Sequence, residues 1–187
     1  EIIRQGEPST LAECEPDPGA EMALPLPVAE RRQVTVLYCE LATDGAEDLD
    51  EALALLRSPQ AHCKEIISSF SGHLVRFHGG SLLAYFGYPQ ASENAARLAV
   101  QAALELTRAA VTGLELRVGV HTGVVICADL QVPDAIGATS GLAIRLRQLV
   151  EPGEVAISGA TQHLVAGYFE CMSLGLRQLR GIQRPLE

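Results

Sequence analysis

The chain has few basic residues and no long apolar run. Of its 187 residues, 14 are Lys or Arg and 23 are Asp or Glu, which gives a net charge of −9. A nucleic-acid-binding surface needs a basic face, so this balance argues against nucleic acid as a partner. No unbroken apolar segment is long enough to span a bilayer, and no secretory signal is visible. We therefore expect a cytoplasmic protein with no membrane segment in this piece.

The cysteines and histidines lack the spacings of a disulfide framework or a zinc site. No two cysteines form a CxxC pair, and no HExxH occurs among the five histidines. An odd number of widely separated cysteines is typical of free thiols in a reducing compartment. Those at positions 39, 63 and 127 lie in apolar runs, so we expect buried, unreactive side chains there; the other two are Cys14 and Cys171.

What is present is enough apolar sequence for a real core. Hydrophobic residues make up 48% of the chain and charged residues 20%, which fits one domain. Residues 1–30 hold five of the ten prolines and show no helical or strand period, so we expect a Pro-rich linker or arm there and a folded domain at 31–187. Because the first residue is Glu1, we interpret the chain as an excised or processed piece of a protein with fused domains.

Hydrophobic patterning predicts alternating strands and helices beyond residue 30. The first strand lies in RRQVTVLYCELA, and two β-hairpins turn at Gly79-Gly80 and at Thr122-Gly123. Helices are expected at 48–57, from Ser58-Pro59 onward, from about Ser92, and at 139–150 and 159–165, with further strands at 154–158 and 168–179. The first part has the order βαββαβ. We therefore expect an α+β fold with a ferredoxin-like core, helices on one face of an antiparallel sheet, and extra C-terminal strands and helices.

Five segments resemble a known family in the order in which they occur. They are ERRQVTVLYCELA, GGSLLAYFGYPQASENAARLAVQAALEL, LRVGVHTGVV, AIRLRQLVEPGEVAIS and YFECMSLGLRQLRGI. Together they are similar to the catalytic domain of class III adenylate and guanylate cyclases, from about Glu30 to Ile182. The relatives that this resemblance suggests are bacterial cyclase domains fused to other signalling modules, which would suit the Pro-rich arm.

The resemblance implies chemistry with two metal ions at a dimer interface. In the family, ATP or GTP is cyclised by attack of its ribose 3′-hydroxyl on the α-phosphate, and two aspartates hold Mg or Mn ions. Magnesium prefers hard oxygen ligands in near-octahedral geometry, so carboxylates are needed there. The site lies between two head-to-tail subunits: one gives the metal ligands, and the other gives an Asn and an Arg. The partner implied is thus a second cyclase domain, in a homodimer or a heterodimer.

Both metal positions depart from the family pattern. The first aspartate corresponds to Glu40 in YCELATDG, which keeps the charge on a longer side chain. The second corresponds to Gly80 in RFHGGS, which has no ligand, and the neutral hydroxyl of Ser81 is a poor substitute. Glu40 is therefore the only metal ligand that the resemblance leaves. Gly79-Gly80 could also simply form a tight turn at low steric cost, and such a turn is compatible with the loss of the metal ligand.

The nucleotide side of the site is partly kept. The base-reading lysine of the family corresponds to Arg76, and its adenine-selecting aspartate to Asp134, which favours adenine over guanine. The transition-state asparagine corresponds to Gly141, and the transition-state arginine to Arg145, one turn further along the same helix face. Arg147 should lie on a different face and be solvated.

These departures favour a regulatory pseudo-cyclase that dimerises and binds a purine nucleotide, with little or no cyclase activity. Three alternatives stay open. The chain could be one half of a heterodimer, supplying Arg76, Asp134 and Arg145 to a partner. It could be an active adenylate cyclase with a rearranged metal site at Glu40 and Asp44, or with a site supplied by a partner. It could also be a ligand-free dimerisation module of a larger signalling protein.

Overall fold

The computed structural model describes residues 30–43, 49–78, 80–109, 114–127 and 138–179. Its elements follow the predicted order of strands and helices closely. They are β1 (Glu30–Thr43), α1 (Leu49–Ser69), β2 (His73–His78), β3 (Ser81–Phe86), α2 (Ala95–Arg108), β4 (Leu114–Cys127), α3 (Ala138–Leu146), the short 3₁₀ helix η1 (Arg147–Leu149), β5 (Val155–Ile157) and α4 (Gly159–Val165).

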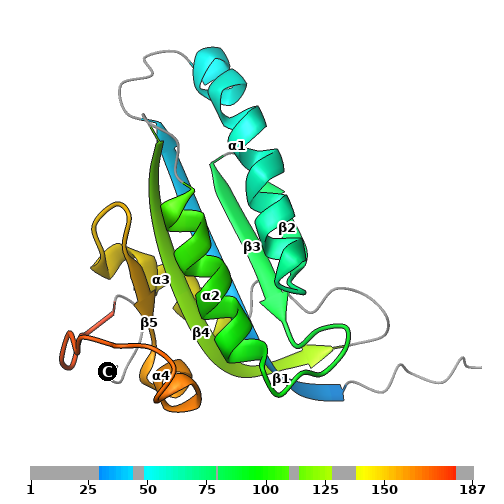
Figure 1. The fold of residues 1–187 in the computed structure, drawn as a ribbon, viewed down its shortest axis with the longest axis vertical. Coiled ribbons are helices and arrows are strands. Elements are labelled where there is room, and N and C mark those ends of the chain that lie inside the picture. The colour runs from blue at the N-terminus through cyan, green and yellow to red at the C-terminus, as the bar shows by residue number, and fades with distance from the viewer. Residues whose placement is uncertain (1–29, 44–48, 79, 110–113, 128–137, 180–187) are drawn as a thin grey trace, which may run out of the picture.

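Five strands form one sheet in the order β2-β3-β1-β4-β5. All neighbours are antiparallel except β4 and β5, which run parallel. Helices α1 and α2 lie side by side on one face of the strands, as Figure 1 shows. The expected βαββαβ core is therefore confirmed, and the C-terminal part adds β5 to its edge together with three short helical segments.

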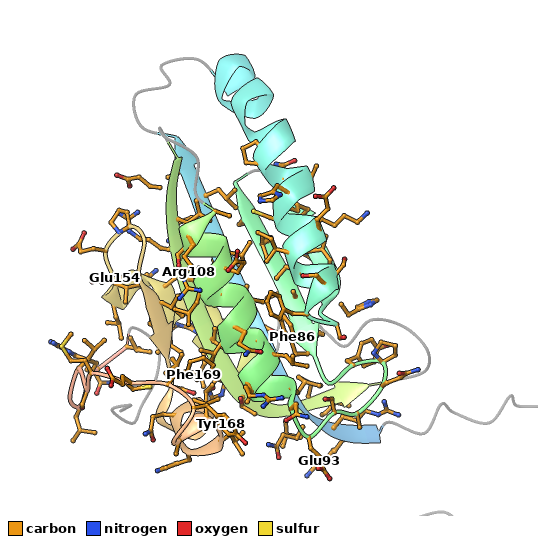
Figure 2. All side chains as sticks on the ribbon, viewed as in Figure 1. Phe86, Glu93, Arg108, Glu154, Tyr168 and Phe169 are labelled. Carbon is orange, nitrogen blue, oxygen red and sulfur yellow. The ribbon has the colours of Figure 1, made fainter. Side chains whose placement is uncertain are left out.

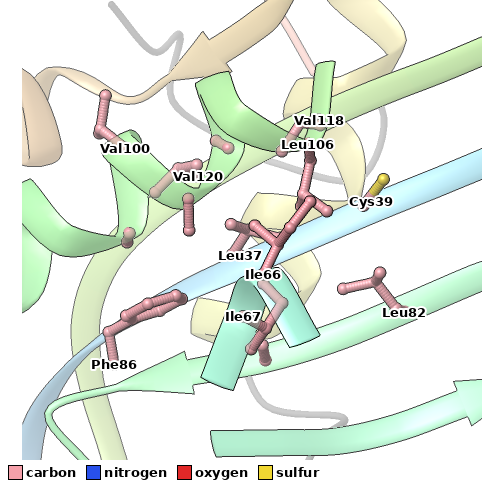
Figure 3. Packing of buried hydrophobic residues seen from close by; sticks show 14 of the residues in the cluster. Leu37, Cys39, Ile66, Ile67, Leu82, Phe86, Val100, Leu106, Val118 and Val120 are labelled. Carbon is pink, nitrogen blue, oxygen red and sulfur yellow. The ribbon is translucent and has the colours of Figure 1, made fainter. Parts of the chain in front are cut away.

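The main core lies between the sheet and helices α1 and α2. Figure 3 shows Ile66 and Ile67 from α1 and Val100 and Leu106 from α2 meeting the strand residues of this face, among them Leu37, Leu82, Phe86, Val118 and Val120. Every residue of this group is buried. Burial of this apolar surface is the main favourable contribution to folding.

Two of the cysteines belong to this core, as predicted. Cys39 of β1 and Cys63 of α1 are both buried and free. Burial raises the pKa of the Cys63 thiol to about 11 and raises the pKa of Cys39 well above its ordinary value. Both side chains therefore stay protonated at neutral pH and act as small apolar groups. Cys171 is exposed, whereas Cys14 and the side chain of Cys127 fall outside the described residues.

The expectation of two helices before the first hairpin is wrong. Helix α1 is continuous from Leu49 to Ser69 with Pro59 inside it. Proline lacks an N–H and so removes a helical hydrogen bond, but this loss does not end the helix here. The predicted apolar face at Cys63, Ile66 and Ile67 is buried as expected.

The expectation of a hairpin at Thr122-Gly123 is also wrong. Strand β4 continues through these residues and pairs with β1 from Leu114 to Cys127. Gly123 lies where α3 approaches the strand, because a Cβ there would be 2.8 Å from Oγ1 of Thr139. The Thr139 hydroxyl donates a hydrogen bond to the Val124 carbonyl at 2.8 Å. Glycine thus serves a close approach of helix and strand, and not a turn.

The expected last strand region at 168–179 forms no regular strand. Met172 and Leu176 are 85% and 73% exposed, whereas Leu179 is buried against Leu146 of α3 and Ala156 of β5. The segment starts at Tyr168, which is labelled in Figure 2. The guanidinium carbon of Arg97 from α2 lies 5.2 Å from its ring centroid. Among the described residues, no helix is long and apolar enough to cross a membrane.

Candidate functional site

The structure brings residues 40 and 80 together at one corner of the sheet. Glu40 lies near the end of β1, directly opposite Ser81 of β3. The N–H of Leu41 donates a hydrogen bond to the carbonyl of Gly80. The two positions that the resemblance assigns to metal ligands are therefore neighbours, and at one of them the chain has no side chain.

The carboxylate of Glu40 is bonded to an arginine from the other end of the domain. Nη1 of Arg147 donates to Oε2 of Glu40 in an ion pair between residues 107 positions apart. The side chains are only 19% and 30% exposed, in that order. The guanidinium carbon of Arg147 also lies 5.6 Å from the ring centroid of Tyr38, within cation–π range. Three side chains, two from β1 and one from η1, thus form a charge-balanced, partly buried cluster.

This arrangement corrects the expectation that Arg147 is solvated. The prediction placed Arg147 two residues beyond Arg145, on a different face of the helix, and took that face to be exposed to solvent. Arg147 does lie on a different face from Arg145, but that face meets the sheet at Glu40 and Tyr38 and is not solvated. Sequence reasoning missed this residue because no motif links position 147 to position 40.

Helix α3 packs directly on the backbone of β4, and this contact positions Arg147. A Cβ at Gly119 would overlap the carbonyl oxygen of Ala143 and would lie 2.9 Å from the backbone nitrogen of Arg147. Gly119 is the cross-strand partner of Tyr38, so α3 covers the sheet face that carries Tyr38 and Glu40. This is the face opposite α1 and α2.

The predicted transition-state pair lies on α3, away from the ion pair. Nη1 of Arg145 donates to the carbonyl of Gly141 at 2.9 Å, so the guanidinium is folded back over its own helix. A Cβ at Gly141 would be 2.8 Å from this Nη1 atom. The two positions share one helix face, as the spacing predicts, and the side chain of Arg145 covers the position where the family has asparagine.

A buried hydroxyl pair fixes the start of α3 to the sheet. The Tyr85 hydroxyl and Oγ of Ser140 are 2.9 Å apart, and both residues are fully buried. We expect Tyr85→Phe to lower the free energy of unfolding by about 1–2 kcal/mol, because Ser140 loses this partner in a buried place. Urea unfolding of both proteins measures the difference, and equal stabilities would contradict it.

The remaining predicted residues are less informative. Arg76 of β2 is exposed and pairs with Leu83, which in turn pairs with Tyr38. Cross-strand partners point to one face of a sheet, so Arg76 belongs to the same face as Glu40, one strand further out. Asp134 and Asp44 lie outside the described residues.

The donor set at the corner does not fit a pair of magnesium ions. Each ion needs several hard oxygen ligands, and the side chains described there provide one carboxylate, which already holds a guanidinium. Elsewhere in the described ranges, no three His, Cys, Asp or Glu side chains lie close enough together to hold a metal.

A second polar cluster lies between β4, β5 and α4. Nδ1 of His121 is 2.7 Å from Oγ of Ser158, and the hydroxyls of Ser158, Thr161, Thr122 and Thr35 continue as a buried chain. Burial lowers the pKa of His121 to about 4, so the ring is neutral at pH 7. A cavity of about 480 Å³ borders this chain of hydroxyls at Thr35 and Thr122, near the start of α2. The cavity lies toward the other end of β1 from Glu40, so it does not coincide with the corner.

The comparisons with known proteins agree with this architecture. Residues 28–186 match the family described as the adenylate and guanylate cyclase catalytic domain. An uncharacterized protein of Mycobacterium tuberculosis is 34% identical over 147 residues, which cover 74% of this chain. The chain spans about half the length of that relative, 46%.

Two solved structures show the same fold. The adenylyl cyclase CyaB of P. aeruginosa has a TM-score of 0.72 at 23% identity, over 84% of this chain and 92% of that one. The guanylate cyclase domain of RhGC from Catenaria anguillulae, solved in complex with GTP, has a TM-score of 0.71 at 21% identity, over 84% and 95%. Since the family match covers most of the chain, the protein belongs to the adenylate and guanylate cyclase catalytic domain family.

Proposed function

We propose that this chain is a catalytically degenerate nucleotidyl cyclase domain that acts in signalling as a dimer, without forming cyclic nucleotide itself. The observation that carries the proposal is the state of the corner between β1 and the β2–β3 turn. Of its two metal positions, residue 80 has no side chain, and the carboxylate of Glu40 is neutralised by Arg147. Phosphoryl transfer in this family depends on metals held there, so the reaction lacks its main electrostatic support.

The losses are large in energetic terms. Removing one preorganised donor to a transition state typically costs about 2.7–4 kcal/mol, or a factor of 10²–10³ in rate. Here Gly141 lacks the transition-state donor, and Gly80 lacks a charged metal ligand. A homodimer repeats both losses in each of its sites, so the second subunit cannot restore them.

The exposed apolar side chains support an assembled state. Val124 and Ile126 of β4 are 59% and 58% exposed, and Met172 and Leu176 are more exposed still. Val124 and Ile126 are two positions apart on one strand, so their side chains share a face, and neighbouring exposed apolar groups are typical of a surface that contacts another protein. A second cyclase domain is the partner that family membership favours.

The proposal is tested by product formation. The purified chain is incubated with ATP or GTP and with Mg²⁺ or Mn²⁺, and cyclic AMP and cyclic GMP are quantified by mass spectrometry. We expect no product above a heat-denatured sample, with an active cyclase domain as the positive control. Cyclic nucleotide formed above that background by the wild-type chain would contradict the proposal.

Nucleotide binding is tested separately from turnover. A ligand that binds only the folded state raises the unfolding temperature, by an amount that depends on its concentration relative to Kd. We expect ATP to raise the unfolding temperature and Arg76→Ala to weaken that shift. No shift with ATP or GTP, with or without metal, would instead favour the ligand-free dimerisation module.

A further inference from the structure

At the corner formed by Glu40 and Gly80, a side chain of the protein supplies the positive charge that faces the carboxylate. Arg147 brings one guanidinium to Glu40, and the pair is mostly shielded from water, with 19% and 30% of the two side chains exposed. In an exposed ion pair both side chains are mobile, and such pairs contribute little. This ion pair joins the end of β1 to η1, which are far apart in sequence. Tyr38 and the packing of α3 on β4 restrict the movement of Arg147.

The packing around Arg147 leaves it little freedom to move away. The ring of Tyr38 lies against its guanidinium, and the close approach of α3 at Gly119 fixes its backbone. Its Nε atom is buried and has no hydrogen-bond partner, so Glu40 provides a large share of its polar contacts. A cation that took Glu40 would leave a partly buried guanidinium without its counter-ion, which is strongly unfavourable.

We propose that Arg147 is the internal counter-ion of Glu40 and that its guanidinium excludes divalent cations from this corner. The inference rests on the proposed function only in taking positions 40 and 80 as the place where the family holds its metals. The corner then differs from one that has merely lost a ligand, because a fixed organic cation has taken the place of the metal.

The test is a cycle of variants in which Mn²⁺ binding is measured by electron paramagnetic resonance. It compares the wild-type chain, Gly80→Asp, Arg147→Met, and the double variant Gly80→Asp/Arg147→Met. We expect no Mn²⁺ binding by the wild type. The double variant should bind at least about tenfold more tightly than Gly80→Asp alone, because only it has both a second carboxylate and a free Glu40.

A matched control separates the position of Arg147 from its charge. Arg108 of α2 is exposed and pairs with Glu105 at 3.7 Å, so Arg108→Met removes one positive charge elsewhere. Gly80→Asp/Arg108→Met should bind Mn²⁺ no more tightly than Gly80→Asp. Thermal unfolding of each variant establishes that the proteins compared are folded.

Several outcomes would overturn the inference. Equal Mn²⁺ affinity of Gly80→Asp and the double variant would show that Arg147 excludes nothing, and a folded double variant that binds no Mn²⁺ would show that another feature keeps metal out. Mn²⁺ binding by the wild type that is lost in Glu40→Gln would place the ion at Glu40 in spite of Arg147 and would contradict the inference directly. Failure of the proposed function appears elsewhere, as cyclic nucleotide formed by the wild-type chain.

Discussion

Gly119→Ala is expected to lower the free energy of unfolding by about 3 kcal/mol or more. The added methyl group would overlap the carbonyl oxygen of Ala143, and a backbone atom cannot rotate away as a side chain can. Overpacking of a filled core costs about 1–3 kcal/mol, and more when the backbone has to move. Helix α3 would shift away from β4 and take Arg147 with it. Urea unfolding followed by circular dichroism measures the loss.

The same substitution at Gly141 is the matched control. The nearest atom to a Cβ there is Nη1 of Arg145, the end of a flexible side chain, which can turn aside. Alanine also favours a helix over glycine by about 1 kcal/mol. Gly141→Ala should therefore stay within about 1 kcal/mol of the wild type. Equal losses for the two variants would show that the contact at Gly119 is not the cause.

The second large effect is a loss of stability at acid pH caused by His121. The ring is buried and neutral, with a pKa near 4, whereas an unfolded histidine titrates near 6.5. Between these values the unfolded chain binds a proton that the folded chain does not, so stability is present above pH 6.5 and is lost as the pH falls toward 4. At about 1.4 kcal/mol for each unit of pKa difference, His121 accounts for a loss of about 2–3 kcal/mol between pH 7 and pH 4.5.

His121→Asn isolates this contribution from the acidic residues that titrate in the same range. Asparagine places a polar atom near the position of Nδ1 and carries no charge, so the variant should lose about 2–3 kcal/mol less than the wild type over this interval. Parallel stability curves for the wild type and His121→Asn would contradict the assignment.

The fold was largely predictable because its signals are local. The helical period of the apolar residues in α2 and the order βαββαβ can both be read from residues a few positions apart in the sequence. Both are confirmed. The error at Gly123 originates in a tertiary contact. Gly123 resembles a turn residue in the sequence, but it is needed because Thr139 of α3 packs against the strand. A single sequence gives no sign of such a contact.

The proximity of residues 40 and 80 was predictable, whereas the ion pair of Glu40 was not. Residues 40 and 80 meet because strand pairing brings them together, which the resemblance implied. The partner of Glu40 could not be inferred, because it depends on the packing of α3 against β4 at Gly119. Arg145, which the motif favoured, is folded back on Gly141, whereas Arg147, which the motif ignored, reaches the carboxylate.

The bare backbone of β4 at Gly119 and Gly123 has a mechanical consequence. No side chains of β4 separate α3 from the strand at these two positions. Helix and strand therefore have no room to slide past each other, so they should move as one rigid unit. A movement of this unit as a whole would then carry Arg147 and Glu40 together. Separation of α3 from β4 would instead break the ion pair between Arg147 and Glu40.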